Sequence, residues 1–427
     1  MKRLIIHFLL VLINIVAGFY ILSLWRGTFP YGPNPSAESL LQANKLAPLN
    51  PDPYYRLGIF HQLEIHNIDL IKSIDFLYKA IERNPLEQEY WLNLAKILDR
   101  MGEKKAFEKA LQNAILVFPT GYQGRWIVGN LLLQKGEYEK ASPHFSYILS
   151  HYPEESSMVY DIWGKVTQDP AFFLEKLVPH DPSSYRQYLS YLYGEGNKEM
   201  AKKVWEGMAH LAYKAECSEV IHYIDFLISH GDIAEAYRIY EAELRVRGLP
   251  IPSRENLAVN GGFEKEKVLG GGFDWKIEAI RGGEITFDNT VASEGRRSLK
   301  ISFSGKENVD FYHVFQYVSL KPNRKYQLKA EVKTKALSTQ SGVKLEIIGI
   351  GPAFYGASQA MTGDNDWREV SVIFRTPKQS QGGLVRLRRE ATEKFDRFIS
   401  GSLWIDNVRI SEEKAGMDSQ PESISSR

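Results

Sequence analysis

The chain contains a single cysteine and has no large excess of either charge. Cys217 has no partner for an intramolecular disulfide, and its place in a helical segment favours burial as a small apolar residue. The 427 residues include 53 Lys and Arg and 52 Asp and Glu, which gives a formal net charge of +1. Nucleic-acid-binding domains carry a basic surplus, so this balance argues against bulk nucleic-acid binding. One cysteine is also compatible with an oxidising periplasm.

Motifs of the common catalytic classes are also missing. The sequence has no G-x-S-x-G, no H-E-x-x-H, no C-x-x-C and no P-loop. The glycine cluster from Gly270 to Phe273 lacks the strand-then-helix context of a phosphate loop, so it predicts an ordinary loop. We therefore expect a protein that is not an enzyme. A glycosidase with two paired carboxylates stays open as an alternative, because such acids need not be close in the chain.

One long apolar run lies near the N-terminus. Residues 4–24 are interrupted by strongly polar side chains only at His7 and Asn14, and 21 residues at ~1.5 Å each span roughly 31 Å, the thickness of a bilayer core. We expect residues 4–25 to be an uncleaved membrane anchor, with a cleavable signal peptide as the competing interpretation. The basic residues among 1–3 would stay in the cytoplasm. This predicts a single-pass protein of a bacterial inner membrane, with its bulk on the periplasmic or extracellular side.

A 34-residue period marks the first half of the chain. Pro85, Pro119 and Pro153 are 34 residues apart, and two glycines keep the same interval. A fixed period of this length indicates a stacked helical repeat. The positions expected to pack the repeats are Trp91, Gly102, Ala114 and Pro119 in one copy, and Gly129, Gly136, Ala141, Phe145 and Pro153 in the next.

These residues resemble the tetratricopeptide pattern, which places a large aromatic, small residues, a turn glycine and a closing proline at these positions. The segment GEYEKASPHF is similar to the second-helix signature of that family. The resemblance implies a helical solenoid over residues 36–249 that binds protein partners, after a linker at 26–35. Residues 154–182 do not fit the period.

At Pro250 the hydrophobic period changes from 3.6 to 2. After a short linker at residues 250–255, alternating runs such as SLKISFS, YQLKAEVKT and LVRLRRE are separated by turn residues. Many short alternating strands indicate an antiparallel β-sandwich, here over residues 256–412. The polar residues 413–427 predict a disordered tail. The expected fold is therefore a multidomain chain, α-helical and then β, preceded by one transmembrane helix.

The order of these strands resembles the jelly-roll carbohydrate-binding modules associated with xylanases and glucanases. Asn260 to Glu264 matches their opening N-x-G-F-E, Gln316 to Tyr326 resembles Q-x-V-x-L-x-P-G-x-x-Y, and Leu403 to Val408 resembles the final D-x-V strand. The resemblance implies sugar binding without cleavage. It also implies a structural calcium ion at Glu264 and Asp406, and no other cofactor is expected. The alternative is that these two carboxylates bind turn amides and an arginine.

A glycan-binding face needs exposed aromatic rings beside hydrogen-bonding side chains. The alternation in DFYHVFQYV predicts one face with Phe311, His313, Phe315 and Tyr317. Outward charges from a nearby strand and rings from loops would complete it, and arginines would suit acidic sugars. The remaining candidates are Arg386, Arg388, Trp275 and Tyr355. The alternatives are that the aromatics pack in the core or between domains, and that the arginines lie on a solvated face.

Taken together, these features predict a non-catalytic envelope scaffold. The solenoid would bind protein partners and the sandwich would bind polysaccharide, in exopolysaccharide or cell-wall assembly. A scaffold with a purely structural sandwich is one alternative, and a glycan-processing enzyme is another.

Overall fold

The computed structural model describes residues 2–28, 35–63, 68–167, 169, 172–210 and 213–413. The chain forms two compact units, residues 1–213 and 214–427. Each unit is described by itself. Most of the predicted 26–35 linker and nearly all of the predicted 413–427 tail lie outside the described residues, as does Met1.

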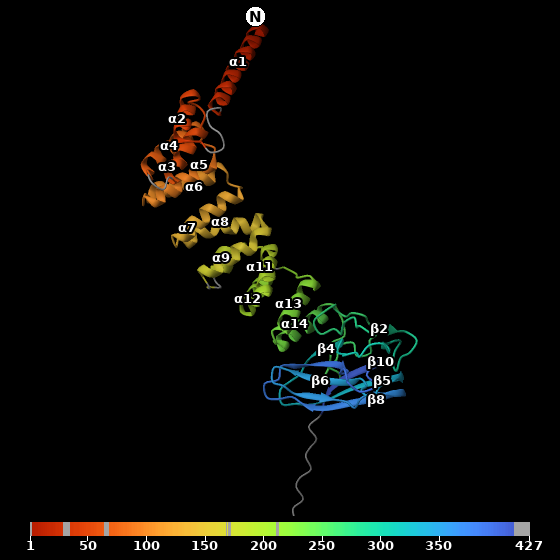
Figure 1. Ribbon diagram of the computed structural model, residues 1–427. Helices are drawn as coiled ribbons and strands as arrows, with labels where there is room; N and C mark the ends of the chain where they lie inside the picture. The colour runs from red at the N-terminus through yellow and green to blue at the C-terminus, as the bar shows by residue number, and fades with distance from the viewer. Residues whose placement is uncertain are drawn as a thin grey trace, which may run out of the picture. The chain divides into compact units, whose positions relative to one another are not determined.

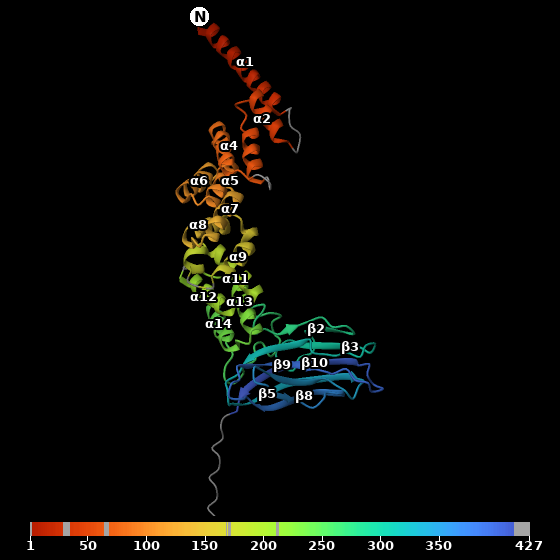
Figure 2. The same ribbon diagram turned by 60° about the vertical axis from the view of Figure 1, so that its left-hand side comes forward.

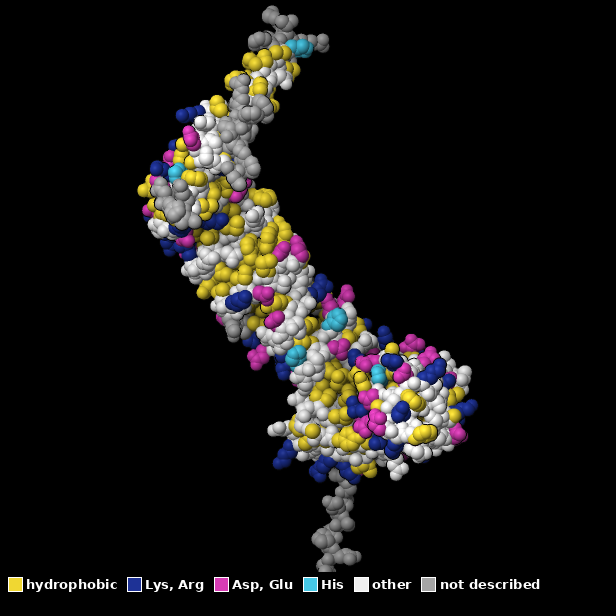
Figure 3. All heavy atoms as spheres, viewed as in Figure 1, with side chains coloured by type: hydrophobic (Ala, Val, Ile, Leu, Met, Phe, Trp, Pro, Cys, Tyr) yellow, Lys and Arg dark blue, Asp and Glu magenta, His cyan; other side chains and the backbone are white. Residues whose placement is uncertain are grey.

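The first helix, α1, runs from Lys2 to Thr28. Large apolar side chains such as Ile13, Val16 and Phe19 are exposed along it. Figure 3 shows hydrophobic side chains on the surface of this helix. Among the described residues, none of the helices meets the combined length and apolarity needed to cross a membrane.

The rest of the first unit is a series of short helices (Figure 1). In chain order they are α2 (Ala37–Leu46), α3 (Asp52–Leu63), α4 (Leu70–Arg83), α5 (Gln88–Arg100), α6 (Lys104–Val117), α7 (Tyr122–Gln134), α8 (Tyr138–His151), η1 (Pro153–Glu155), α9 (Ser156–Val166), η2 (Phe173–Leu177), α11 (Pro182–Glu195) and α12 (Lys198–His210). Gly102 and Gly136 lie two residues after the ends of α5 and α7, and they have φ of +76° and +71°. This left-handed conformation favours glycine and turns the chain into the next helix.

Small residues let the helices of one repeat pack closely. Ala114 and Ala141 are fully buried. A Cβ atom on Gly129 would lie 2.7 Å from the Phe145 ring, so α7 and α8 could not approach this closely with a larger residue. The segment that breaks the 34-residue period contains α9 and η2, which is a five-residue π-helical turn.

The second unit contains two more helices and a two-sheet sandwich (Figures 1 and 2). The helices are α13 (Cys217–Ser229) and α14 (Ile233–Val246). The strands are β1 (Lys276–Ile277), β2 (Gly283–Asp288), β3 (Ser298–Ser304), β4 (Val314–Ser319), β5 (Lys325–Leu337), β6 (Lys344–Ile350), β7 (Tyr355–Ala357), β8 (Gly363–Arg375), β9 (Gly382–Arg388) and β10 (Ser400–Glu412). The last helix pair therefore belongs to the same compact unit as the sandwich.

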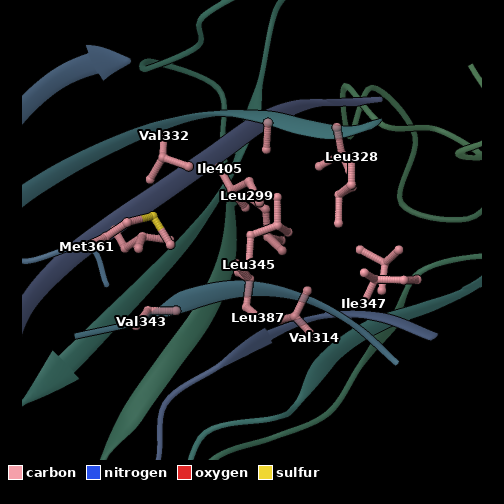
Figure 4. Close-up of a cluster of buried hydrophobic side chains, with 14 of the residues drawn as sticks. Leu299, Val314, Leu328, Val332, Val343, Leu345, Ile347, Met361, Leu387 and Ile405 are labelled. Atoms are coloured by element: carbon pink, nitrogen blue, oxygen red, sulfur yellow. The ribbon is translucent and has the colours of Figure 1, made fainter. Parts of the chain in front are cut away.

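Both sheets are antiparallel. One has the order β1-β4-β9-β6-β7 and the other β2-β3-β10-β5-β8. Alternate residues of each strand point inward, as in β4, where Val314 and Val318 are buried and Phe315 and Tyr317 are not. Figure 4 shows Leu299, Val332 and Ile405 of one sheet near Val314, Leu345 and Leu387 of the other, in one continuous core. The predicted helical half and the antiparallel sandwich are thus confirmed.

Candidate functional site

The outward face of the β1-β4-β9-β6-β7 sheet, called here the groove face, carries a row of apolar side chains. Tyr355 of β7 pairs with Ile348 of β6, Ile348 with Leu384 of β9, and Leu384 with Tyr317 of β4. Directly opposite residues on antiparallel strands project from the same face, so these four side chains cross the sheet as one line, called here the apolar row. Tyr355 is 62% exposed, which is unusual for a large aromatic on a β-strand.

A second line, called here the mixed row, lies beside the first. Glu346 pairs with Arg386, Arg386 with Phe315, and Phe315 with Lys276 of β1. The Arg386 Nε lies 3.1 Å from a Glu346 carboxylate oxygen, and the Tyr355 hydroxyl donates to Glu346 at 2.8 Å. The groove face therefore places aromatic rings directly beside hydrogen-bonding groups. Figure 3 shows hydrophobic side chains gathered on the visible face of this unit, bordered by charged ones.

Helix α13 meets the groove face at the edge strand β1. A cavity of about 520 Å³ is lined by Phe315 and Tyr317 from the sheet and by Asp225, Ile228 and Ser229 from α13. Burial, with the Asp225 charge adding to it, raises the pKa of Tyr317. Its hydroxyl therefore stays protonated at neutral pH and keeps a proton to donate.

The Gly270–Phe273 loop holds α13 and α14 against the sandwich. The buried Asp274 carboxylate accepts the backbone N–H groups of Val268, Leu269 and Gly270 at 2.7–3.0 Å, and the Tyr240 hydroxyl at 2.6 Å. The Asp225 carboxylate of α13 accepts the Gly272 N–H at 3.0 Å and lies 3.3 Å from Lys276 Nζ. Phe273 packs between the rings of Tyr237 and Tyr240 of α14. The predicted loop is present, and its contacts with the helices fix the wall of the cavity.

Two predicted glycan-binding aromatics lie in the core. Phe311 is fully buried and packs edge-on against Phe303. Trp275 is 9% exposed and packs on Phe263, but it also lines the cavity beside α13. The expected alternation fails because β4 begins only at Val314, while Phe311 forms an isolated bridge with Arg389 before it. Tyr312 is the exposed residue of this segment, although the alternation predicted it inward.

The other predicted residues divide between the groove face and its surroundings. Phe315, Tyr317, Tyr355 and Arg386 lie on the groove face. His313 precedes β4 and stacks on Tyr312 with ring centroids 4.5 Å apart. Arg388 forms an ion pair with Asp310 and also donates to backbone carbonyls. Its charge is therefore neutralised beside the face.

Sequence reasoning missed five contributors to this site. Ile348, Leu384 and Glu346 could have been found from the alternation within VKLEIIG and LVRLRRE, once those strands were known to be neighbours. Asp225 and Ser229 gave no signal, because they lie on a helix that sequence periodicity assigns to the solenoid. Only the tertiary packing brings α13 to β1.

Glu264 and Asp406, the predicted calcium ligands, lie near each other at one end of the sandwich. Both oxygens of the fully buried Asp406 accept backbone N–H groups, from Ser293, Glu294 and Asn407 at 2.7–3.1 Å. Glu264 accepts the Arg296 N–H at 2.8 Å. Within the described residues, no cluster of three or more acidic, histidine or cysteine side chains could hold a metal. These donors fit the turn-amide alternative, and the calcium ion that the resemblance implies stays a prediction.

A separate cavity of about 550 Å³ lies in the helical unit. It is lined by α6, α7 and α8, with Leu111, Ile115 and Leu132 as apolar walls and Glu108 and Lys140 at its rim. Leu116, also in the lining, is 79% exposed. Burial, reinforced by the nearby Arg125 charge, lowers the pKa of His144 in this cavity to about 4.

Three solved structures are similar to parts of the chain. A crystal structure of MamA matches with 17% identity over 41% of this chain and 85% of its own, with a TM-score of 0.25. A structure entitled "Family 16 Carbohydrate Binding Module-2" matches with 22% identity over 37% of this chain and 100% of its own, with a TM-score of 0.28. "CBM4 structure and function" matches with 14% identity over 36% and 99%, with a TM-score of 0.27.

No curated protein matches the chain. The model of a protein family described as "Carbohydrate binding domain" matches residues 255–391. Residues 255–391 are therefore similar to the carbohydrate-binding domains of that family.

Proposed function

We propose that the groove face binds an uncharged polysaccharide without cleaving it. The observation that carries this proposal is the pairing of the two rows. The apolar row offers ring faces and aliphatic side chains to the apolar faces of sugar rings. The mixed row lies two residues away along β4, β9 and β6, on the same face, with hydrogen-bonding groups for hydroxyls. The family match over residues 255–391 supports the same ligand class.

The charges of the groove face favour a neutral polymer over an acidic one. Arg386 is paired with Glu346, and Arg388 with Asp310. A uronate would have to displace these carboxylates to reach either guanidinium. The cavity beside α13 adds the carboxylates of Asp225, Glu266 and Glu278 against Lys267 and Lys276. This surplus of acidic groups repels an anionic sugar. The neutral ligand proposed here therefore differs from the acidic sugar that the arginines alone predicted.

Affinity electrophoresis of the full chain tests this proposal. We expect gels that contain xylan or mixed-linkage β-glucan to retard the chain, and gels with polygalacturonate or alginate to leave its mobility unchanged. Tyr355→Ala removes an exposed ring from the groove face. The lost aromatic contact contributes about 1 kcal/mol or slightly more, so binding should weaken by about tenfold. Tyr312→Ala, which removes an exposed tyrosine outside the face, is the matched control.

The outcomes separate the alternatives. No retardation by any polymer would reject sugar binding and leave the sandwich with a structural role. Retardation by the anionic polymers alone would reject the neutral ligand class. Release of reducing sugar during incubation with a bound polymer would establish the glycan-processing alternative.

We propose that the helical unit binds a protein segment in the α6–α8 cavity. The exposed Leu116 beside a lining of apolar side chains supports this role, since exposed apolar surface of this kind marks interaction sites. Leu116→Asp should abolish capture of a partner by the full chain, while Leu49→Asp, at an equally apolar exposed position on the same unit, should not. Equal capture by both variants would reject this cavity.

The membrane setting stays a prediction. We propose that residues 4–25 anchor the chain and that its bulk lies outside the cytoplasm, in an envelope that assembles polysaccharide. The apolar run in the sequence supports this proposal. Extraction of cell membranes with alkaline carbonate should leave the full chain in the pellet. Release into the supernatant would reject the anchor.

A further inference from the structure

We propose that helix α13 closes one end of the sugar groove, so that the site receives the terminus of a polysaccharide chain. This inference rests on the proposed function, because it concerns how the same groove face is bounded. A sandwich alone would leave the face open at both edge strands. Here only the β7 edge is open in the described part of the unit.

The position of the wall follows from the sheet order. The groove face runs from β7, which carries Tyr355, to β4, which carries Tyr317, and β1 forms the edge beyond β4. The Asp225 carboxylate of α13 contacts Lys276 of β1, and Tyr317 shares the cavity with Ile228 and Ser229. A saccharide that follows the apolar row from Tyr355 to Tyr317 therefore meets α13 at the end of that row.

The wall is fixed by close backbone packing. A Cβ atom on Gly271 would lie 2.3 Å from Ile221, and one on Gly272 would lie 2.9 Å from Ile224. At these two positions only glycine allows the loop to approach α13 this closely. The helix pair cannot move away from the groove without breaking the buried hydrogen bond from Tyr240 to Asp274 and the bond from the Gly272 N–H to Asp225.

The length of the row sets the size of the bound segment. Four strands separated by about 4.8 Å give about 14 Å from Tyr355 to Tyr317, which accommodates a short oligosaccharide. A site that is closed at one end binds only the terminal segment of a polysaccharide, so each polysaccharide end binds one copy of the protein. A groove that is open at both ends also binds internal segments, so a long polysaccharide binds several copies. Closure therefore predicts how many copies of the protein bind each polysaccharide chain.

Isothermal titration of the full chain with size-fractionated samples of the polymer that retards it best tests this inference. We expect one bound protein per polysaccharide chain at every chain length. A stoichiometry that rises in proportion to chain length would overturn the closed end while leaving sugar binding intact. If no polymer of the panel binds, the proposed function fails, and this inference fails with it.

A pair of variants on α13 gives an independent readout. Ser229 is exposed and lines the cavity, so Ser229→Trp should fill the end of the groove and weaken binding by about tenfold or more. His222 is exposed on the same helix outside the cavity, and His222→Trp should bind like the wild type. Circular dichroism would show that both variants keep their helices. Unchanged affinity in Ser229→Trp would show that α13 lies outside the sugar site.

Discussion

The Asp274 carboxylate is the single group on which the junction between helix and sandwich most depends. It is 5% exposed and accepts hydrogen bonds from three backbone amides and one phenol. We expect Asp274→Ala to lower the free energy of unfolding of the second unit by about 3 kcal/mol, because one buried phenol and three part-buried backbone amides lose their acceptor. Tyr240→Phe removes only one of these donors and should cost about 1 kcal/mol. Urea unfolding of the full chain measures both, and equal losses would contradict the central role of the carboxylate.

His144 should make the helical unit sensitive to acid. Burial and Arg125 lower its pKa from 6.5 to about 4 in the folded chain. Below about pH 6.5 the unfolded chain takes up the proton first, so stability falls as the pH falls towards 4. By about pH 4.5 the loss from this one group should reach about 2.5 kcal/mol relative to neutral pH. Fluorescence-monitored urea unfolding at the two pH values measures it.

The control for this prediction is His144→Gln, which cannot titrate in this range. The variant should lose less stability than the wild type between the same two pH values. An identical loss in both proteins would show that other groups, such as the carboxylates, carry the acid sensitivity.

At the scale of elements, the second unit depends on how closely its loop fits the helix pair. Gly270 and Gly272 both have positive φ, at +92° and +60°, but only Gly272 is in contact with helix side chains. Gly270→Ala should cost about 1 kcal/mol of backbone strain, and Gly272→Ala should cost about 1–3 kcal/mol more because its Cβ would overlap Ile224 and Tyr240. Thermal unfolding compares the two variants. Equal losses would show that the loop does not limit the docking of α13 and α14.

Local patterns predicted the elements well where a single periodicity applied. Strand β3 coincides with SLKISFS, and the alternation in LVRLRRE placed Val385 inward and Arg386 outward. Prediction failed where the chain leaves a regular strand. Phe311 follows no alternation because it precedes β4, and its burial depends on a bridge to Arg389, 78 residues away in the chain.

The boundary of the binding site could not be predicted from the sequence for a related reason. The periodicity of α13 and α14 is helical, so it groups them with the repeats, and no residue pattern reports that the pair packs on β1. Asp225 and Ser229 therefore looked like ordinary solvent-facing residues of a helix. Their role follows only from contacts across about 50 residues of intervening chain, such as Asp225 with Lys276.

For the whole molecule, the two units suggest a division of labour within one chain. The sandwich unit carries a face suited to sugars, and the helical unit carries an apolar cavity suited to a protein segment. The helix pair α13 and α14 belongs to the sandwich unit and takes part in the proposed sugar site. We expect sugar to contact the groove face.

Hydroxyl-radical footprinting of the full chain, with and without a saturating amount of the retarding polysaccharide, tests this claim most directly. Tyr355 and Tyr317 should become protected from oxidation when the polymer is bound, while the exposed Tyr312 should react as before. Unchanged oxidation of Tyr355 and Tyr317 in the presence of bound polysaccharide would contradict the account.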